Sequence, residues 1–376
     1  MSLDDAPPPD RPETAAPPVP PVLVRAVGRA GHLTLNRPRS INALNLDMIR
    51  LLADALDAWE HDPEIAFVLL DGAGERGLCA GGDVRELREW VLAGRSDDTA
   101  AYFRAEYALN ARIAEYPKPI VALADGVTMG GGIGLAGHAA VRVVTERSRL
   151  AMPEVRIGFT PDVGGSWLLA RAPGRAGEYL ALTAGTMDAA DALSAGFADV
   201  FVPSERLDAL RDALFACEAG EAGEITQLAA AVAGGAGAGD ALGAGPSALE
   251  AARPWIDDAF AADDVEGVIA RLRARPEAEA STTADALDAL SPSALTVTLA
   301  AIRSARALPG LRAALAQEYG LVLWFAQTQP DLAEGIRAQL VDKDRTPHWR
   351  PATLAEVPAD LGAQALAWVP PAPLWA

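Results

Sequence analysis

Phe67-Val-Leu-Leu-Asp71 is an apolar run that leads into the glycine-rich loop Cys79-Ala-Gly-Gly-Asp83, and Ile120-Val-Ala-Leu-Ala124 leads in the same way into Gly130-Gly-Gly-Ile-Gly134. A strand, a glycine loop and a helix therefore occur in this order twice, which predicts an α/β protein with a repeated ββα architecture. Glycine loops present backbone N–H groups with no side chain in the way. Two such donors brought to one point can hold an oxygen on which negative charge develops.

The rest of the chain divides into four expected parts. Residues 1–21 are rich in proline and lack periodicity, which indicates a disordered tail. Residues 22–217 form the predicted core, with a hairpin at 22–36, helices at 46–59, 84–92, 99–115, 177–183 and 189–195, and strands at 65–71, 120–124, 141–145 and 148–151. Residues 218–245 are rich in alanine and glycine and are predicted to be a flexible insert or a weak helix. Residues 246–376 are predicted to be a helical C-terminal region.

Composition restricts the function without selecting one. The chain has 376 residues, 50% of them hydrophobic, and a formal net charge of -19. This charge argues against nucleic acids and anionic membrane surfaces as partners. The N-terminus has no signal-peptide pattern and no apolar run approaches the ~20 residues of a membrane span, so a cytoplasmic protein is expected. Cys79 and Cys217 are expected to be free thiols.

The second glycine loop also matches a dinucleotide-binding fingerprint, with Gly132, Gly134 and Gly137 in the required spacing and Glu154 about 20 residues further on. Several residues separate the strand from these glycines, whereas a nucleotide-binding turn begins directly at the strand end. A third interpretation is that the glycines only allow a helix to pack closely on a sheet. The parallel first loop favours a catalytic role over both alternatives.

Two carboxylates stand in backbone contexts that proline and glycine restrict. Glu154 follows Met152-Pro153, and Asp162 lies in Pro161-Asp-Val-Gly-Gly165. Restricted backbone suits groups that must be aimed at a substrate, although Glu154 could also be a solvent-facing loop residue and Asp162 a turn former or helix N-cap. The four histidines show no metal-ligand spacing, and no serine- or cysteine-hydrolase signature is present. Carboxylates and backbone groups are therefore expected to carry the chemistry.

These motifs together resemble the crotonase (enoyl-CoA hydratase/isomerase) superfamily. The likeness rests on Leu35-Asn-Arg-Pro38, on both glycine loops and on Pro153-Glu154 through Gly165. A narrower likeness, to the branch that hydrolyses 3-hydroxyisobutyryl-CoA, rests on the segment Tyr102–Asn110, on Ser291-Pro-Ser293 and on Val341-Asp-Lys-Asp344. The resemblance covers residues 22–357. It implies a spiral of ββα units, a helical C-terminal region, a role in valine breakdown and no cofactor beyond the CoA of the substrate.

The resemblance also implies roles for single residues. The N–H groups of Gly82 and Gly131 would form an oxyanion hole, Glu154 and Asp162 would be the catalytic acids, and Glu106 would line the substrate pocket. Further substrate contacts are expected from the loop residues Ala80, Asp83 and Gly130. The arginines nearest the loops, Arg37, Arg39 and Arg85, are the candidates for the CoA phosphates.

One departure from the hydratases affects the expected reaction. Their second catalytic glutamate, two positions beyond the glycine triplet, is Gly134 in this chain, which argues against hydration of a double bond. Thr160 also replaces a residue that is commonly bulky in the hydrolases. The favoured interpretation is a CoA-thioester hydrolase. An enoyl-CoA hydratase or isomerase and a CoA-binding pseudoenzyme remain alternatives, and the sequence allows a homo-oligomer.

Overall fold

The computed structural model describes residues 19–234 and 243–375. The predicted disordered tail therefore lies almost wholly outside the described residues. Among these residues the strands form a six-stranded sheet in the order β1-β2-β3-β4-β6-β8 and a two-stranded sheet of β5 and β7. β1 pairs with β2 antiparallel, and the remaining pairs are parallel. The strands are β1 Val22–Val27, β2 Ala30–Leu35, β3 Phe67–Gly72, β4 Ile120–Ala124, β5 Val127–Met129, β6 Val141–Val144, β7 Arg149–Ala151 and β8 Val200–Phe201.

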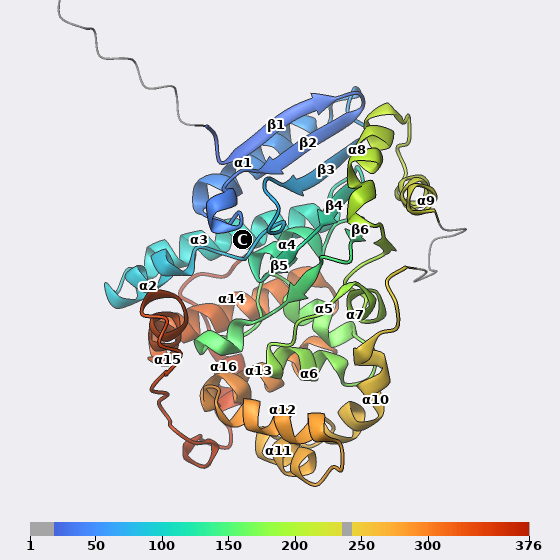
Figure 1. Ribbon diagram of the computed structural model, residues 1–376. Coiled ribbons are helices and arrows are strands. Elements are labelled where there is room, and N and C mark those ends of the chain that lie inside the picture. The colour runs from blue at the N-terminus through green and yellow to red at the C-terminus, as the bar shows by residue number, and fades with distance from the viewer. Residues whose placement is uncertain (1–18, 235–242, 376) are drawn as a thin grey trace, which may run out of the picture.

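Helices cover both faces of the large sheet and form most of the chain after β8 (Figure 1). The α-helices are α1 Leu46–Trp59, α2 Val84–Leu92, α3 Ser96–Glu115, α4 Gly131–Ala136, α5 Gly165–Arg171, α6 Ala176–Thr183, α7 Ala189–Ser194, α8 Leu207–Ala216, α9 Ala222–Ala233, α10 Ala248–Ala259, α11 Val265–Arg273, α12 Ala278–Asp288, α13 Pro292–Ala305, α14 Leu311–Thr328, α15 Asp331–Ile336 and α16 Leu361–Ala367. Short helical turns are η1 Pro38–Ser40, η2 Glu154–Ile157, η3 Ser204–Arg206, η4 Arg337–Val341 and η5 Leu354–Glu356.

The predicted ββα repeat is visible in how the strands alternate between the two sheets. β4 and β6 belong to the large sheet, whereas β5 and β7, which follow them, form the small one. The first glycine loop joins the small sheet through a bridge from Cys79 to Thr128. Successive turns of the chain therefore bring the two glycine loops side by side, as the repeat predicted.

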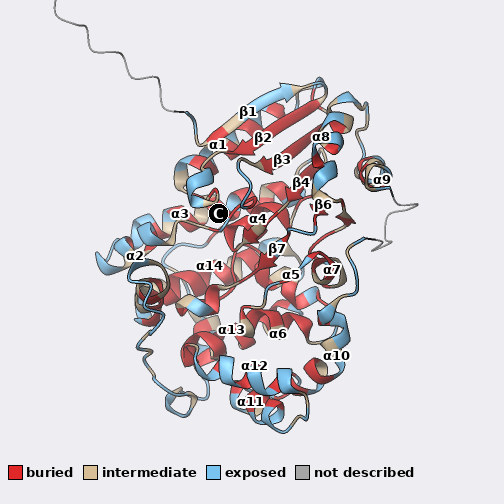
Figure 2. Cartoon of the chain, in the orientation of Figure 1, coloured by how far each residue is buried: buried red, intermediate tan, exposed pale blue. Residues whose placement is uncertain are grey.

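Two apolar clusters hold these layers together. One face of the large sheet packs on α8 and α9, with Phe67, Leu69 and Val121 buried between them. The other face belongs to a larger cluster that continues without interruption from Val22 into the C-terminal helices. Figure 2 shows that α4 and α13 are mostly buried, and α14 is buried mainly between Ala314 and Phe325. The C-terminal helices thus share one core with the sheet.

Several details differ from the expectations. The helix predicted at 99–115 begins at Ser96, and the short strands β5 and β8 and the helix α5 were not predicted. Helix α4 is the helix of the second strand–loop–helix unit, for which the sequence predicted no bounds. The expected insert 218–245 contains α9, whose Ile225 is fully buried against the sheet. This part of the insert is therefore a packed helix, because its apolar residues recur at helical spacing. Residues 235–242 of the insert lie outside the described residues.

Candidate active site

The two glycine loops meet with their amide groups close together. Leu44 pairs with Gly82 and fixes the first loop by accepting from the Asp83 amide and donating to the carbonyl of Gly81, both at 2.8 Å. Gly131 is the first residue of α4. A Cβ at Gly131 would stand 3.3 Å from the amide nitrogen of Gly82. Within the described residues, neither the Gly82 nor the Gly131 amide donates a hydrogen bond to the protein.

Helix α3 presents a row of buried polar side chains to these glycines. Tyr102, Glu106 and Asn110 are spaced four residues apart, so they share one face of the helix. The row carries buried polar atoms that have no hydrogen-bond partner in the described part of the chain, namely Tyr102 Oη, Glu106 Oε1 and both amide atoms of Asn110. These atoms lie against three glycines, because a Cβ would stand 2.9 Å from Tyr102 Oη at Gly82, 2.6 Å from Glu106 Oε1 at Gly131 and 2.8 Å from Asn110 Nδ2 at Gly134.

Glu154 reaches the same place from the small sheet. It begins η2 directly after β7, and a Cβ at Gly130 would stand 3.0 Å from its Oε1. Gly130 has a φ of 49°, a left-handed conformation that favours glycine. Only 7% of Glu154 is exposed. The alternative that it is a solvent-facing loop residue is therefore wrong.

Asp162 is also buried and does not cap a helix. Its Oδ2 accepts a 2.8 Å hydrogen bond from the hydroxyl of Tyr107 on α3. The N-cap of α5 is Gly164, without a side-chain cap bond. The turn is closed by a bond from the Gly165 amide to the backbone carbonyl of Asp162. The interpretation of Asp162 as an N-cap is therefore wrong, and its side chain is available to the site.

Burial and mutual repulsion raise the pKa values of the acids in this region. Burial raises the pKa of Glu106, Glu154 and Asp162, and the charge of Asp162 raises the pKa of the two glutamates further. The pKa of Asp162 is raised to about 7, while the hydrogen bond from Tyr107 holds it down. Raised carboxyl pKa values allow these groups to hold or exchange protons near neutral pH.

The glycines further along α4 serve packing. A Cβ at Gly132 would stand 2.5 Å from the carbonyl oxygen of Cys79, and one at Gly134 would stand 2.7 Å from Cβ of Val163. These residues lie inside α4 and not in a turn that ends a strand. The dinucleotide interpretation is therefore unsupported, and close packing explains Gly132 and Gly134.

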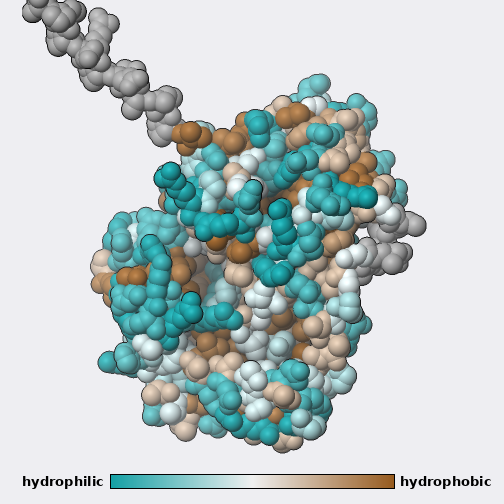
Figure 3. Space-filling view, viewed as in Figure 1, coloured by the Kyte–Doolittle hydropathy of each residue, from teal (hydrophilic) through white to brown (hydrophobic). Residues whose placement is uncertain are grey.

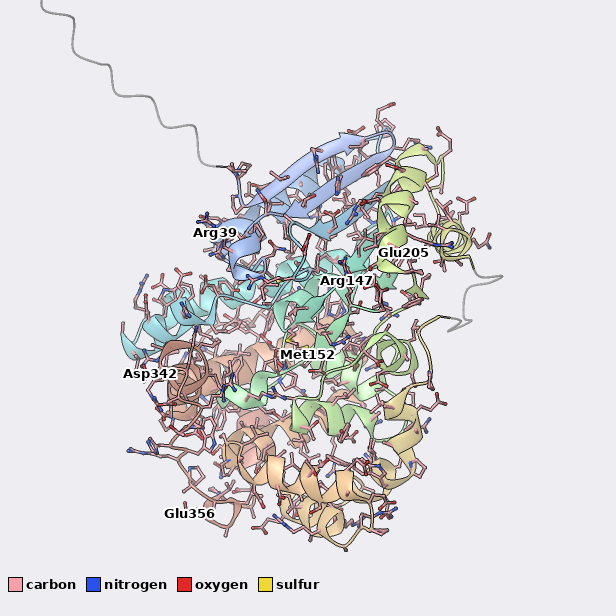
Figure 4. All side chains as sticks on the ribbon, viewed as in Figure 1. Arg39, Arg147, Met152, Glu205, Asp342 and Glu356 are labelled. Carbon is pink, nitrogen blue, oxygen red and sulfur yellow. The ribbon has the colours of Figure 1, made fainter. Side chains whose placement is uncertain are left out.

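The remaining predicted residues lie at the rim or have structural partners. Ala80 is exposed and Asp83 is partly exposed. Arg37 donates to the carbonyl of Ala43 at 2.5 Å and lies 3.4 Å from Asp83, which ties the first loop to η1. Arg85 donates to the carbonyl of Leu340 at 2.9 Å, so α2 is fastened to η4. Arg39 is exposed beside α1, whereas Met152, two residues before Glu154, lies centrally (Figure 4).

Several polar residues around the site were not predicted. Tyr102 and Asn110 lie in the segment Tyr102–Asn110 without an expected role, although their four-residue spacing from Glu106 was a usable signal. Glu318 on α14, whose carboxylate accepts from the Gly164 and Ser166 amides at 2.6 and 2.9 Å, was not predicted either. No local signal could have found Glu318, because its position beside Asp162 depends on the packing of distant helices.

Other site types are not visible among residues 19–234 and 243–375. They contain no group of three or more His, Cys, Asp or Glu side chains placed to hold a metal ion. Across this same part of the chain, no helix combines the length and apolarity needed to cross a bilayer.

Thr160, which stands where the hydrolases commonly have a bulky residue, is fully buried, and its hydroxyl accepts a 3.0 Å hydrogen bond from the Thr298 hydroxyl. In the space-filling view, the surface is hollowed between the projection of α2 and α15 and the body of the molecule (Figure 3).

Comparisons with known proteins agree on one family. Residues 30–366 match the model described as enoyl-CoA hydratase/isomerase. Proteins named "3-hydroxyisobutyryl-CoA hydrolase, mitochondrial" are similar to the chain: that of Rattus norvegicus is 40% identical over 339 residues, 89% of this chain and 86% of the relative. That of Homo sapiens is 38% identical over 337 residues, with the same coverage.

Two solved structures are similar over nearly the whole chain. A carnitinyl-CoA dehydratase from Mycobacterium thermoresistibile is 44% identical with a TM-score of 0.85, and the match covers 93% of this chain and 97% of that one. An enoyl-CoA hydratase from Rhodobacter sphaeroides is 41% identical with a TM-score of 0.83, covering 94% and 99%. The names of the similar proteins thus include both hydrolases and hydratases.

Proposed function

The chain belongs to the enoyl-CoA hydratase/isomerase family, and from that premise we propose that it hydrolyses the thioester of a short branched 3-hydroxyacyl-CoA, with 3-hydroxyisobutyryl-CoA as the leading substrate. The observation that carries this proposal is the buried Glu154 beside two glycine loops whose Gly82 and Gly131 amides have no partner among the described residues. The 3-hydroxyisobutyryl-CoA hydrolases at up to 40% identity support the choice of acyl group. This substrate would give the enzyme a role in valine breakdown.

The Gly82 and Gly131 amides bind the thioester carbonyl oxygen and stabilise the negative charge that develops on it. A charged Glu106 beside Gly131 would oppose this stabilisation. Burial and the charge of Asp162 raise the pKa of Glu106 well above its ordinary value, which favours its protonated form. A protonated Glu106 can donate a further hydrogen bond to the substrate.

Glu154 attacks the carbonyl carbon or activates the water that does so, and Asp162 transfers a proton. The carboxylate of Glu154 either adds to the carbon, forming an anhydride that water then cleaves, or removes a proton from an attacking water. Both routes consume one water and release a carboxylic acid and the CoA thiol. Asp162, with a pKa of about 7, can give a proton to the departing sulfur. A single turnover in ¹⁸O-labelled water distinguishes the routes, because transfer of an oxygen atom between Glu154 and the product requires the anhydride.

Hydration of an enoyl-CoA is the second candidate, favoured by the names of the two similar solved structures. Gly134 argues against hydration, because glycine supplies no side chain where the hydratases have their second catalytic glutamate. Its Cβ position is closed by Val163 and Asn110. A hydratase shares the activation of water and the proton transfer between two groups. Here the second group of the family pattern is missing.

The deciding experiment compares two rates on the purified protein. Release of free thiol from 3-hydroxyisobutyryl-CoA measures hydrolysis, and loss of enoyl absorbance from crotonyl-CoA measures hydration. We expect hydrolysis to dominate and hydration to be negligible. Hydration at an equal or higher rate would replace the proposal by the hydratase alternative, and binding of CoA esters without either reaction would indicate a pseudoenzyme. Thiol release from 3-hydroxypropionyl-CoA then tests the acyl preference.

Contacts of Arg37 and Arg39 with the CoA phosphates and a cytoplasmic location remain predictions. The relatives named above are described as mitochondrial, so location needs its own measurement, such as fractionation of the source cells.

A further inference from the structure

Glu318 is a fully buried acid that the proposed mechanism does not use. It lies in the middle of α14, in the helical C-terminal region, and none of its surface is exposed. Its carboxylate is directed at the turn that carries Asp162. The Gly164 amide donates to Oε2 at 2.6 Å, the Ser166 amide donates to Oε1 at 2.9 Å, and the Ser166 hydroxyl also donates to Oε1. One side chain therefore satisfies three donors of a single turn.

This turn needs an external support. Val163 has a φ of 53° and Gly164 a φ of 79°, so two consecutive residues are left-handed. The left-handed conformation is costly for a β-branched residue and persists only where the surroundings hold it. The carbonyl of Val163 contacts His138 Nε2 at 2.8 Å, which supports the turn from the other side. Glu318 makes more hydrogen bonds to the turn than His138 does, since it accepts from both Gly164 and Ser166.

The direction of Asp162 depends on the backbone of this turn. Its side chain has one hydrogen bond to a side chain, from the hydroxyl of Tyr107. A rotation of the peptide after Asp162 would therefore move the carboxyl group relative to Glu154 and the glycine amides. A displacement of about 1 Å can lower turnover by about 10²-fold.

We propose that Glu318 is a positioning residue for the reaction: it holds the Asp162–Ser166 turn from the C-terminal helices, so that Asp162 is aimed at the substrate. The proposal rests on the proposed function for the identity of the substrate. The hydrogen bonds that carry it do not depend on that identity. The C-terminal region thereby takes part in building the active site through Glu318.

A second consequence concerns the charge of Glu318. The ionisable groups that interact with it are Tyr107 on α3, Glu154 on η2 and Asp162 on the turn. The charge of Glu318 raises the pKa of Glu154, after burial and Asp162. That effect needs an ionised Glu318, and the pKa of Glu318 is itself raised to about 8. Below neutral pH it is largely protonated, so Glu318→Gln should leave the acid limb of the pH–rate profile in place.

The test uses Glu318→Gln, Ser166→Ala and a matched control in the full chain. Gln keeps the size of Glu318 but places an amide NH₂ group against one of the N–H donors, whereas Ser166→Ala removes only one of the three bonds. Glu178→Gln is the control, because Glu178 is also a fully buried glutamate and pairs with Arg175 and Arg306 away from this turn. It should lower the melting temperature without changing turnover.

We expect Glu318→Gln to lower kcat about 10- to 100-fold with KM within about threefold. Ser166→Ala should lower kcat less and keep the position of the limb. Amide hydrogen exchange at residues 163–166 should rise in Glu318→Gln and stay unchanged in Glu178→Gln. If Glu318→Gln does not fold, Ser166→Ala with the exchange measurement decides the question.

Unchanged kcat in a folded Glu318→Gln protein would overturn the proposal, and so would unchanged exchange at the turn. An equal loss of kcat in Glu178→Gln would also overturn it. A wild-type protein that releases no thiol contradicts the proposed function and not this inference. In that case exchange still reports whether Glu318 holds the turn, and the variants are compared on the reaction that the wild type does catalyse.

Discussion

Four carboxyl groups, those of Glu106, Glu154, Asp162 and Glu318, are buried in one region, and none of them has a lysine or arginine partner among the described residues. Like charges this close cannot all be ionised in a medium of low polarity. They therefore titrate as a coupled set, and apparent pKa values belong to the set more than to one residue. Such clusters are costly for stability and are typical of sites that move protons.

Glu154→Gln tests the residue at the centre of this set. Gln keeps the shape of the side chain but can neither add to the carbonyl nor accept a proton. We expect thiol release to fall at least ~10³-fold, while the dissociation constant for a CoA thioester measured by calorimetry changes little, because the charge acts mainly in the transition state. Near-normal turnover would remove Glu154 from the chemistry.

Asp162→Asn separates catalysis from folding. The turn is closed by the backbone of Asp162, and an Asn can still accept the bond from Tyr107, so the melting temperature at pH 7 should not fall. Turnover should fall strongly. Because the charge of Asp162 raises the pKa of Glu154, any residual activity should have its acid limb at lower pH than in the wild type. A destabilised but fully active variant would restore the interpretation of Asp162 as a turn former.

At the scale of elements, the first turn of α4 is the feature that makes an oxyanion hole available. The first amides of a helix have no partner within the helix. Here the Gly131 amide stands beside the Gly82 amide of the other loop. The helix dipole adds partial positive charge at the same end. The rest of α4 is held by glycines that pack against Cys79 and Val163.

Gly131→Val should close this hole. Its Cβ would stand 2.6 Å from Glu106 Oε1 and 3.3 Å from the Gly82 nitrogen, so the amide could not reach a carbonyl oxygen. Loss of one donor typically lowers the rate about 10²- to 10³-fold. Gly223→Val in α9, where nothing lies within 4 Å of the added Cβ, is the control for the cost of Val in a helix. Turnover of the Gly131 variant close to that of the control would refute the assignment.

Gly134→Glu tests whether the missing hydratase glutamate could be restored. The new side chain would meet Val163 and Asn110 at 2.7 and 2.8 Å, and overpacking costs about 1–3 kcal/mol before the burial of its charge is counted. We expect a lower melting temperature and no gain in crotonyl-CoA hydration. Gly223→Glu, in open space, should be neutral. A gain in hydration would mean that α4 can adapt and that Gly134 alone distinguishes the two reactions.

At the scale of the molecule, sequence patterns predicted the elements that depend on residues close together in the chain. The hairpin of β1 and β2 and helix α1 follow from alternation and from apolar residues at helical spacing, and Asn45 caps α1 through its side chain. β5 and β8 have three and two residues, too few for a periodicity. The resemblance predicted that Glu154, Asp162 and the two loops lie together. The role of Glu318 depends on contacts between distant segments, which one sequence does not reveal.

The buried carboxyl groups also predict how the stability of the whole molecule depends on pH. An acid whose pKa is raised by folding favours the folded state while it is protonated, and this contribution is lost as pH rises through the folded pKa. The pKa is raised to about 7 for Asp162 and about 8 for Glu318, and burial raises the pKa of Glu106 and Glu154 as well. His138 acts in the opposite direction, because burial lowers its pKa to about 4. Its contribution is complete once the unfolded histidine is neutral, above pH of about 6.5.

The contribution of the buried acids is therefore best measured in the window from pH 6.5 to 8.5, where the ion-paired carboxylates and His138 no longer titrate. We expect the free energy of unfolding, measured by urea denaturation, to fall across this window by a few kcal/mol, because each unit of pKa shift corresponds to about 1.4 kcal/mol. Glu318→Gln and Asp162→Asn should each flatten the curve, because each removes one group that must ionise in the folded state. A wild-type curve that is flat or rises between these pH values would mean that the four acids are ionised in the folded protein, and the proton-exchanging role of Asp162 would fail with it.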